Sequence, residues 1–532
     1  MNKENTLYLS LRDSTKAYSK RTALIYMNKK IRYKSLLEKV HRLSQGLISY
    51  GIKKDDVVSV CLPNIPSAVH LLYAINQIGA IANLIHPLMK YDQMKMIMEE
   101  TGSRLLFTLD TNYQEFIPLI NIGVRVIACS PVSGLNPLLI LGYSLQNRTK
   151  LKGIKKIDKI KSFYGKTQLF SYDNDIKKDA FYLHSGGTTG KPKVVALSSF
   201  SVNALAGNGL DILGIKDTEN KYMLAVLPIF HGFGLCMGMH ACLAFGATNT
   251  LMPKFHSKQV VKYLKKGQIS FIIGVPILFE ALLRNLSFKG PSLKNLRIAF
   301  VGGDFVAPSL IERFNERMET NGSKARLYEG YGLTEVVTVC SVNNDAHHRK
   351  GSVGKLLPNI QMKIVDLETK KDLDFGQDGE LYVKGETMMN GYRFLKDEGE
   401  QPFVKDDRGD IWIATGDYGS LDQDGYVYFR QRLKRIIKVG GTNVFPNEIE
   451  GAVMELGNVH ECAAIAISDT KLGNAIKLFV VLDRCYANQN IDKQICEIVE
   501  KRCGIYAVPK EITYRDSLPK TLVGKVDTKA LS

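Results

Sequence analysis

The sequence predicts an α/β protein with a large N-terminal domain of layered sheets and a smaller α+β C-terminal domain. Three observations support this fold class. The first half of the chain alternates buried strand patterns with helical patterns, alternating segments after Gly379 indicate antiparallel sheet, and a new order of helix and strand begins after Val444. At 532 residues the chain is too long for one compact core, so we expect at least two domains.

The α/β alternation is clearest in the first 130 residues. Strand patterns cover 55–62, 104–110 and 124–129, and a helical pattern covers 68–79. The apolar window 68–89 is interrupted by polar residues, so it predicts a buried helix followed by a strand and not a membrane span. Residues 130–179 are less regular and are expected to form a surface excursion.

Two further strands in this part are followed by glycine-rich turns. "DAFYLH" (179–184) leads into a loop rich in Gly and Thr, and "RIAFVGGDF" (297–305) ends in Gly302 and Gly303. In α/β folds the ligands bind at the carboxyl ends of the strands. We therefore expect a binding site where these two strands end.

The second half predicts an antiparallel β subdomain and then the small domain. "GELYVKG" (379–385), "DGYVYFRQR" (424–432) and "KRIIKVGG" (434–441) follow one another at short spacing. Pro446 can open a helix whose face carries Ile449, Val453 and Leu456, and strands at 462–468 and 475–482 and a helix at 492–502 follow. We place the domain boundary near 432–435.

Composition limits the class of protein and its partners. The net charge is +18, from 71 Lys and Arg against 53 Asp and Glu. This excess fits an acidic partner or a polyphosphate ligand, but a lysine-rich solvated surface is the preferred interpretation, because charge alone says nothing about a site. A cluster of Lys150, Lys152, Lys155, Lys156, Lys159 and Lys161 lacks the interleaved aromatic residues of single-strand nucleic-acid binders, so no nucleic-acid partner is expected.

The cysteines and the N-terminal residues suggest a compartment. The nine cysteines contain no Cys-x-x-Cys pair, so neither a zinc site nor a disulfide scaffold is predicted. The first ten residues are polar and have no secretory apolar region. We expect a cytoplasmic protein with at most peripheral membrane contact.

The stretch "HSGGTTGKPKVV" (184–195) has the composition of a phosphate-binding loop. Glycines let backbone N–H groups approach an anion, hydroxyls add donors and lysines add positive charge. The spacing matches neither the P-loop of nucleotide hydrolases nor the dinucleotide fingerprint. The candidate phosphate ligands are Ser185, Gly186, Gly187, Thr188, Thr189, Gly190, Lys191 and Lys193.

Five other stretches concentrate residues that could bind a ligand. They are "PIFHGFG" with His231, "YEGYGLTE" with Thr334 and Glu335, "WIATGD" with Asp417 after a turn, the basic and then glycine-rich "RQRLKRIIKVGG", and "PKTLVGKV" with Lys525. Each signal is weak alone. A single His is more often a packing residue, Asp417 could be a turn residue, and Lys525 could be a surface lysine.

In this order and at these separations, the motifs together are highly specific. The chain resembles the adenylate-forming superfamily of acyl-CoA synthetases, firefly-type luciferases and non-ribosomal adenylation domains over nearly its whole length, and it is most similar to fatty-acyl-CoA synthetases. The resemblance implies a large ATP- and acid-binding domain (1–431), a hinge (432–435) and a small mobile domain (436–532).

The resemblance also implies a role for each matching residue. The loop 185–193 would hold the ATP β- and γ-phosphates. Tyr331 would lie against adenine beside Gly302, Gly303, Asp304 and Gly332, Thr334 would contact the α-phosphate, Glu335 would hold Mg²⁺, and Asp417 and Arg432 would bind the ribose. Lys525 would bridge the substrate carboxylate and the α-phosphate, with His231 among the catalytic residues. Lys434 matches the hinge, and Lys438, Gly440 and Gly441 match the thioester-forming site.

The sequence departs from the family pattern at four positions. Gly186 stands where Ser or Thr is usual, Val194 replaces a usual Gly, Asp304 occupies an often small position, and Gln431 replaces a common Gly. Gly186 removes one hydroxyl donor from the phosphate loop, but Ser185, Thr188 and Thr189 remain. We expect activity to be retained.

The implied reaction has two steps. ATP first activates a carboxylic acid to an acyl-adenylate with release of pyrophosphate, and a thiol then displaces AMP. Coenzyme A is the first choice of thiol, and the phosphopantetheine of an acidic carrier protein is the alternative. A luciferase-type oxygenase and a catalytically silent ATP-binding homologue stay open as other classes, although the presence of Thr334, Glu335, Asp417 and Lys525 disfavours the silent one.

The expected acyl pocket points to an apolar acid. The segment 228–249 contains no Asp or Glu, whereas an amino-acid substrate would need a carboxylate for its ammonium group. His231, Phe233, Gly234, Met237 and Gly302 are the candidate pocket residues. We expect a medium or long fatty acid first and an aryl acid second.

Overall fold

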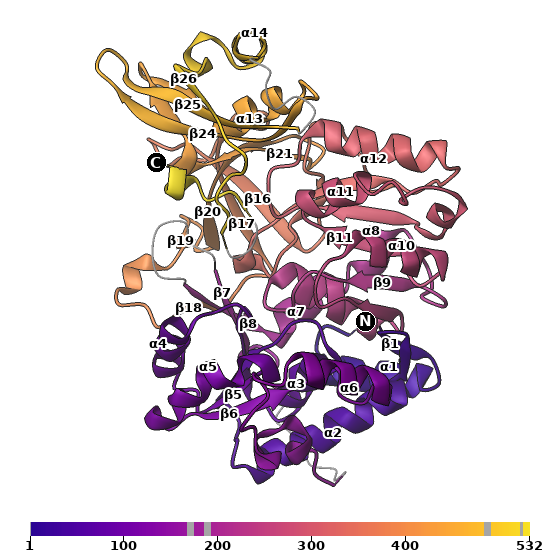
Figure 1. Cartoon of the computed structure of the whole chain (residues 1–532). Coiled ribbons are helices and arrows are strands. Elements are labelled where there is room, and N and C mark those ends of the chain that lie inside the picture. Colours follow the sequence, from indigo (N-terminus) through magenta and orange to yellow (C-terminus); the bar gives the residue numbers. More distant parts are fainter. Residues whose placement is uncertain (1, 167–174, 186–192, 484–490, 522–524, 532) are drawn as a thin grey trace.

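The computed structural model describes residues 2–166, 175–185, 193–483, 491–521 and 525–531 (Figure 1). Figure 1 shows the C-terminal residues as an orange-to-yellow unit packed above the larger N-terminal part. The predicted fold class is confirmed, since layered α/β sheets are followed by an antiparallel sheet and a small α+β unit.

Two large, mostly parallel sheets form the N-terminal part. The first has the strand order β15-β14-β13-β12-β11-β9-β10-β1-β2, and the second has the order β18-β8-β7-β4-β3-β5-β6. The strands of the first are β15 (Lys355–Leu356), β14 (Ser341–Val342), β13 (Leu327–Tyr331), β12 (Ile298–Val301), β11 (Phe271–Gly274), β9 (Tyr222–Ala225), β10 (Thr248–Leu251), β1 (Thr22–Tyr26) and β2 (Lys29–Arg32). Those of the second are β18 (Gly391–Arg393), β8 (Val194–Ser198), β7 (Asp179–His184), β4 (Ile81–Leu84), β3 (Val57–Cys61), β5 (Leu105–Leu109) and β6 (Arg125–Cys129).

Helices lie between the two sheets and on their outer faces. The inner helices share one continuous core with both sheets: α1 (Leu7–Tyr18), α2 (Tyr33–Ser49), α3 (Pro66–Gln77), α7 (Ser199–Ala206), α8 (Gly209–Leu213), α9 (Ala241–Ala244) and the π-helix η5 (Phe233–His240). A second core joins the first sheet to α10 (Ser257–Lys265), α11 (Pro276–Leu283) and α12 (Pro308–Thr320). A third joins the other sheet to α4 (Tyr91–Thr101), α5 (Tyr113–Phe116) and the 3₁₀ helix η2 (Ile117–Ile122).

One helix stands apart from these cores. The region 130–179, expected to be irregular, contains α6 (Pro137–Gln146), and no residue of this fully described helix is buried. Among the described residues, no helix is both long and apolar enough to cross a bilayer. The segment 68–89 forms α3 and β4, as the sequence predicts.

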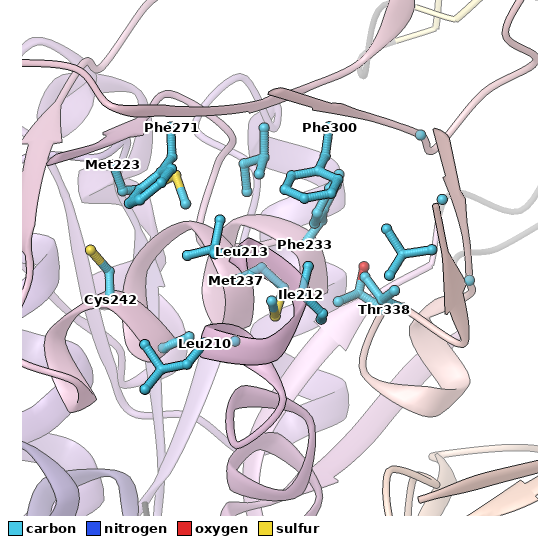
Figure 2. Close-up of a pocket in the computed structure, with 18 of the residues that line it drawn as sticks. Leu210, Ile212, Leu213, Met223, Phe233, Met237, Cys242, Phe271, Phe300 and Thr338 are labelled. Carbon is cyan, nitrogen blue, oxygen red and sulfur yellow. The ribbon is translucent and has the colours of Figure 1, made fainter. Parts of the chain in front are cut away.

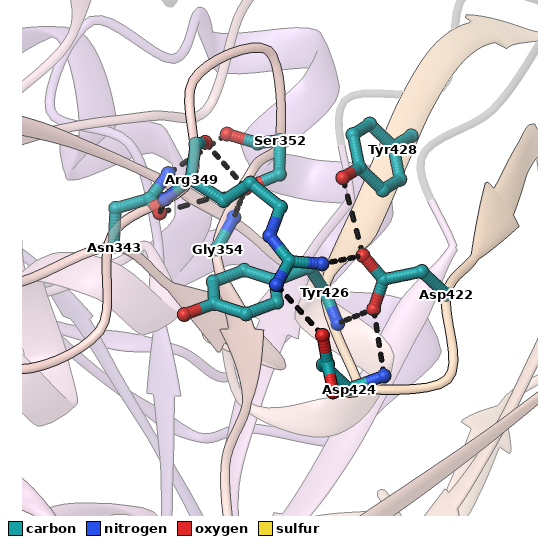
Figure 3. Close-up of polar contacts among 8 residues, drawn as sticks. All are labelled: Asn343, Arg349, Ser352, Gly354, Asp422, Asp424, Tyr426 and Tyr428. Carbon is teal, nitrogen blue, oxygen red and sulfur yellow. Dashed lines mark hydrogen bonds and ion pairs between the residues drawn. The ribbon is translucent and has the colours of Figure 1, made fainter.

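The antiparallel subdomain follows the two large sheets. Its strands are β16 (Ile360–Val365), β17 (Gly379–Gly385), β19 (Phe403–Lys405), β20 (Ile411–Leu421) and β21 (Val427–Arg432), and all their pairings are antiparallel. The side chain of Arg349 ties the loop before β15 to the turn between β20 and β21 (Figure 3). It pairs with Asp422 and Asp424 and lies over the ring of Tyr426, with its guanidinium carbon 4.1 Å from the ring centroid. This contact fixes the turn from which β21 leads toward the small domain.

The C-terminal part has cores of its own. The hairpin β22 (Ile437–Val439) and β23 (Thr442–Val444) precedes α13 (Pro446–Met454), and β24 (Val459–Asp469), β25 (Gly473–Leu482) and β26 (Glu511–Tyr514) form a three-stranded sheet within the described residues. Ile449 and Val453 of α13 pack with Ile495 of α14 (Asp492–Cys503). The predicted helix and its face at Ile449 and Val453 are confirmed, whereas Leu456 lies just past the end of α13 and packs against the same core. The predicted strands and helix after it are also confirmed.

Candidate active site

The site residues converge at the carboxyl ends of β12 and β13. Gly302, Gly303 and Asp304 follow β12, and Tyr331 is the last residue of β13. Thr334 and Glu335 begin the 3₁₀ helix η7 (Thr334–Val336) just beyond it. Because β12 and β13 are parallel neighbours, both turns open at the same edge of the sheet.

Tyr331 and Asp417 form a buried pair at the centre of the site. The Tyr331 hydroxyl donates a hydrogen bond to Oδ2 of Asp417 at 2.7 Å, and the Tyr331 ring stacks on Phe429 with centroids 5.6 Å apart. Burial raises the pKa of the Tyr331 hydroxyl, and the Asp417 charge raises it further. The other oxygen, Oδ1, has no hydrogen-bond partner within the described residues and lies 3.4 Å from Nε of Arg432. One buried carboxylate oxygen therefore remains available to a ligand.

The prediction that Asp417 follows a turn is wrong. Asp417 lies inside β20, where the pairing with β17 changes register: Tyr382 opposes Ala414 and Glu380 opposes Tyr418. The extra residues on β20 form a bulge, and Gly416 within it has a φ of +70°. A bulge re-aims a side chain without ending the strand, and here it turns the Asp417 carboxylate toward Tyr331.

Glu335 is held by a residue that the sequence motifs did not indicate. The Tyr392 hydroxyl donates a hydrogen bond to Oε1 of Glu335 at 2.7 Å. Tyr392 lies on β18, which pairs with β8 directly after the phosphate-loop stretch. Nζ of Lys193 lies 4.6 Å from the centroid of the Tyr392 ring. Tyr392 therefore connects the expected metal ligand to the expected phosphate loop.

The phosphate loop is described only at its two ends. Ser185 and Lys193 close its base, since the Ser185 backbone N–H donates to the Lys193 carbonyl at 2.9 Å and the Ser185 hydroxyl donates to the same oxygen at 3.2 Å. Gly186, Gly187, Thr188, Thr189, Gly190 and Lys191 lie outside the described residues. His184 before the loop is neutral at pH 7, because burial lowers its pKa to about 4.

Lys525 of the C-terminal part faces this same site. The surrounding protein desolvates the Lys525 ammonium and lowers its pKa, and the carboxylates of Asp304 and Asp417 and the guanidinium of Arg432 act on it electrostatically. Lys525 in turn helps to lower the pKa of His231 to about 4, after the larger effects of burial and of His86. The structure thus brings Lys525, His231, Asp304, Asp417 and Arg432 together from distant parts of the chain.

The other predicted C-terminal residues occupy a hairpin and a connecting turn. Lys438 is exposed on β22, and Gly440 and Gly441 form the two-residue turn to β23 with φ values of +56° and +83°. Two successive positive φ angles are what a type I′ hairpin turn needs, and glycine adopts them without strain. Lys434 is exposed in the 3₁₀ helix η9 (Leu433–Arg435) between β21 and β22.

An apolar cavity adjoins the site at Gly302, Gly303 and Tyr331. It extends from Gly302, Gly303, Tyr331 and Thr338 to Cys242, Phe245 and Ala247, and Figure 2 shows Thr338 and Cys242 on opposite sides of it. The predicted pocket residues Phe233, Met237 and Gly302 line it, whereas His231 and Gly234 are not among its described lining residues. A Cβ on Gly234 would lie 2.1 Å from the Pro228 carbonyl oxygen, so the space beside Gly234 is filled by backbone.

Two glycines near this site, Gly332 and Gly232, allow neighbouring segments to approach closely. A Cβ on Gly332 would lie 1.4 Å from the Thr338 carbonyl oxygen, and one on Gly232 would lie 1.7 Å from the Val337 carbonyl oxygen. Val337 itself has a φ of +68°, a strained conformation for a β-branched residue. The loop after Glu335 is therefore held tightly against the segment that carries His231.

Sequence patterns missed part of the cavity wall. α8 and the residues after it contribute Gly209, Leu210, Ile212, Leu213 and Ile215. These positions look like an ordinary packed helix, because apolar periodicity does not distinguish a core from the wall of a cavity. No motif indicated His86, whose ring centroid lies 4.6 Å from that of Phe230.

Solved structures share this architecture. The ATP-bound MatB of Rhodopseudomonas palustris has a TM-score of 0.85 at 22% identity and covers 100% of this chain and 98% of its own. The o-succinylbenzoate CoA synthetase MenE of Bacillus subtilis, solved with ATP and magnesium, has a TM-score of 0.78 at 21% identity over 98% of both chains. The fold is thus that of the adenylate-forming ligases.

Sequence relatives and family models extend this result. A long-chain-fatty-acid–CoA ligase of Bacillus subtilis is 28% identical over 98% of this chain and 93% of its own length, and one from Haemophilus influenzae is 29% identical over 96% and 91%. The AMP-binding enzyme family matches residues 11–393, and the AMP-binding enzyme C-terminal domain matches 448–525. The chain belongs to the AMP-binding enzyme family. The prediction of an AMP-forming acid–thiol ligase is confirmed at this level.

Proposed function

We propose that this enzyme activates a medium- or long-chain fatty acid with ATP and transfers the acyl group to coenzyme A. One observation carries the choice of acid: the apolar cavity that opens beside Tyr331, Gly302 and Gly303. None of its described lining residues carries a charge.

The wall chemistry favours an unsubstituted apolar tail. A dicarboxylate such as succinylbenzoate, or an amino acid, would place a second charge inside the cavity, and a buried charge without a partner is costly. The polar lining side chains are few and neutral, with Thr338 and Tyr331 at the nucleotide end and Thr218 farther along. The two relatives named as long-chain-fatty-acid–CoA ligases support the same choice.

The nucleotide is proposed to lie between the glycine turn after β12 and the Tyr331–Asp417 pair. Adenine would rest against Tyr331 beside Gly302, Gly303, Asp304 and Gly332. The Asp417 oxygen that lacks a hydrogen-bond partner among the described residues suits a ribose hydroxyl, with Arg432 beside it. Ser185, Lys193 and the loop between them would hold the β- and γ-phosphates, and Thr334 would contact the α-phosphate.

Glu335 is the proposed protein ligand for Mg²⁺. Within the described residues, no group of three or more His, Cys, Asp and Glu is arranged to hold a metal ion. A single carboxylate still fits, because Mg²⁺ with nucleotides is commonly bound by one or two carboxylates together with phosphate oxygens and water. The Tyr392 hydrogen bond orients the Glu335 carboxylate for this role. When bound, the ion would neutralise phosphate charge.

In the first step the protein must bring two anions, the substrate carboxylate and the α-phosphate of ATP, close together. The substrate carboxylate attacks the α-phosphorus of ATP, the bond to the bridging oxygen breaks, and pyrophosphate leaves. The carboxylate is already ionised at pH 7, so no general base is needed. Lys525 would lie between the carboxylate and the α-phosphate, where its charge offsets their repulsion and holds them in line. His231 stays neutral near it, because its pKa is about 4.

The second step is proposed to use a different face of the small domain. The thiolate attacks the acyl carbonyl, and AMP departs with the electron pair of the broken bond. We propose that residues 436–532 turn on a hinge at 432–435 around Lys434, relative to residues 1–431. Lys525 then leaves the site, and Lys438 with the Gly440–Gly441 turn approaches it.

The thiol acceptor and the compartment remain proposals. Coenzyme A is the first candidate, and the phosphopantetheine of an acidic carrier protein is the alternative, which the net charge of +18 would suit. A cytoplasmic location is proposed from the absence of paired cysteine motifs in the sequence.

One experiment separates these outcomes. Purified enzyme is incubated with ATP, Mg²⁺, a fatty acid and either coenzyme A or a phosphopantetheinylated acyl carrier protein, and both AMP and thioester are measured. The proposal expects AMP and acyl-CoA in equal amounts. Thioester on the carrier protein alone would favour the alternative acceptor, AMP release without thioester and with light or oxygen consumption would favour an oxygenase, and no acid-dependent AMP would indicate a silent homologue.

A further inference from the structure

The helix α6 exposes apolar side chains that no other described residue covers. The exposed fractions are 76% for Leu138, 50% for Leu139, 56% for Leu141 and 66% for Leu145. A surface helix normally turns its apolar residues toward the core, and a helix that is apolar nearly all round is normally buried. Exposed apolar patches of this kind mark docking surfaces.

α6 is fixed to the body of the protein by its opposite side. The Tyr143 hydroxyl donates a hydrogen bond to Oδ1 of Asp110, just after β5. The Asn136 side chain caps the helix itself by accepting from the Leu138 N–H at 2.9 Å. Tyr143 and Ile140 are half-buried. The leucines are thus displayed on an anchored helix.

A run of positive charge follows α6 directly. Residues 148–161 contain seven Lys and Arg and one acidic residue, Asp158. All six lysines of the cluster at 150–161 are exposed, and none forms an ion pair with another described residue. Asp158, the one acidic residue among them, accepts a hydrogen bond on Oδ2 from the Tyr113 hydroxyl at 3.1 Å, and its single negative charge offsets only one of the seven positive charges. The net positive charge therefore faces solvent.

The basic segment is also held in place. An Arg125 guanidinium N–H donates to the Ile157 carbonyl at 3.0 Å, Lys159 forms a parallel bridge with Ala128 of β6, and Ile160 and Phe163 are buried. β6 is the edge strand of its sheet. In Figure 1, β6 and α6 lie in the lower part of the molecule, and the C-terminal unit lies at the top.

We propose that the α6 patch, which consists of the four exposed leucines of α6 and the six lysines at 150–161, binds the surface of an anionic phospholipid membrane. The leucines would enter the boundary between headgroups and acyl chains, and the lysines would contact lipid phosphates. With ten residues, α6 is about 15 Å long, half of what a span needs, so it suits an interfacial position.

Charge favours an anionic membrane over a second copy of this chain as the partner of the α6 patch. Two copies meeting at this patch would bring two lysine clusters of the same sign together, and such like-charge contacts are unfavourable. An anionic bilayer supplies both an apolar phase and a dense negative charge. This proposal does not depend on which acid the enzyme activates.

The test is co-sedimentation with sucrose-loaded vesicles made of equal parts phosphatidylglycerol and phosphatidylcholine, compared with pure phosphatidylcholine. The wild-type chain is expected to bind the anionic vesicles and to lose binding at high salt. Leu138→Ser with Leu145→Ser should lower the vesicle partition coefficient by about tenfold. Lys150→Gln, Lys152→Gln, Lys155→Gln and Lys156→Gln together should lower it by about tenfold or more.

Matched controls separate the patch from general surface properties. Leu286→Ser with Phe375→Ser removes side chains that are 85% and 60% exposed elsewhere, and Lys265→Gln, Lys289→Gln, Lys324→Gln and Lys493→Gln together remove the same charge from other exposed positions. Both controls should bind like wild type. All variants should keep wild-type ATP–pyrophosphate exchange with a soluble acid, which shows that they fold.

Three outcomes would overturn the proposal. The first is equal partition of wild type onto anionic and neutral vesicles, or onto neither. The second is patch variants that bind as the controls do. The third is a patch-dependent complex with a purified acidic acyl carrier protein, or a patch-dependent dimer in sedimentation velocity, in the absence of vesicle binding. Either complex would assign the surface to a protein partner.

Discussion

The Tyr392 hydroxyl donates a 2.7 Å hydrogen bond to the carboxylate of Glu335, across 57 residues of sequence. Burial and the Glu335 charge both raise the pKa of Tyr392, so its proton stays in place to orient that carboxylate. Mutation of a residue that orients a metal ligand commonly lowers metal affinity by about tenfold or more. Tyr392 is therefore the proposed positioning residue for the metal ligand.

Tyr392→Phe should raise the Mg²⁺ concentration needed for half-maximal adenylation by about tenfold, because the Glu335 carboxylate loses its orienting donor. Saturating Mg²⁺ should restore most of the rate. Glu335→Gln, which removes the ligand charge, should not be rescued in this way. If the Mg²⁺ dependence of Tyr392→Phe is unchanged, or if only its melting temperature falls while its kinetics stay intact, the Tyr392–Glu335 hydrogen bond has only a structural role.

Lys525→Ala should lower the rate of acyl-adenylate formation by ~10²–10³, because one charge between two reacting anions is lost. Thioester formation from a pre-made adenylate should be largely spared. Lys438→Ala is the complementary variant and should affect the second half-reaction more. Equal losses in both half-reactions for Lys525→Ala would contradict its proposed role.

Lys434→Pro should restrict the proposed hinge, because proline fixes φ near −65°. One half-reaction should then fall much further than the other, while the melting temperature changes little at this exposed position. Lys434→Ala, which keeps backbone freedom, is the matched control. Wild-type rates in both half-reactions of the proline variant would place the hinge elsewhere.

Four buried histidines should make the free energy of unfolding fall as the pH is lowered below about 6.5. Burial lowers the pKa to about 3 for His70 and His240 and to about 4 for His184 and His231. The unfolded chain binds their protons near pH 6.5, so stability is complete above that pH and is lost as the pH falls toward 4. Each histidine should contribute about 2 kcal/mol to the loss between pH 8 and pH 5.

His240 offers the sharpest check of this pH dependence. Its Nε2 lies 2.7 Å from Oδ1 of Asn203, and its Nδ1 lies 3.0 Å from the Tyr73 hydroxyl, an arrangement that suits the neutral ring. His240→Gln should reduce the loss of unfolding free energy between pH 8 and pH 5, whereas the exposed His347→Gln should leave it unchanged. Identical pH profiles for the two variants would contradict the assignment.

Much of the fold could be predicted from local patterns. The strands at 55–62 and 104–110 and the helix opening at Pro446 carry their own periodicity and capping signals, and each appears where the sequence places it. Tyr331, Asp417 and Lys525 were found through motif order, and the structure brings them together. What local patterns could not give is pairing between distant segments.

Tyr392 illustrates this limit. Its place beside Glu335 depends on β18 pairing with β8, about two hundred residues earlier. Asp417 was misplaced in a turn because a bulge inside β20 has the same Thr-Gly-Asp composition as a turn. The leucines of α6 look like core residues in the sequence, and only the fold shows that nothing within the described chain covers them.

The acid is tested most directly by ATP–pyrophosphate exchange across a panel of fatty acids of increasing length, aryl acids and amino acids. Each methylene in the apolar cavity should contribute up to ~0.8 kcal/mol until the cavity ends. Gly209→Leu is the matched variant. A Cβ at Gly209 would lie 3.5 Å from the Phe245 ring and 3.6 Å from the Ala241 side chain, so the added group narrows the cavity without a backbone clash. The account predicts exchange that rises with chain length to octanoate and beyond in the wild type, and a shift to shorter acids in Gly209→Leu but not in Gly209→Ala. Strong exchange with an amino acid or a dicarboxylate, and none with octanoate or longer acids, would contradict it.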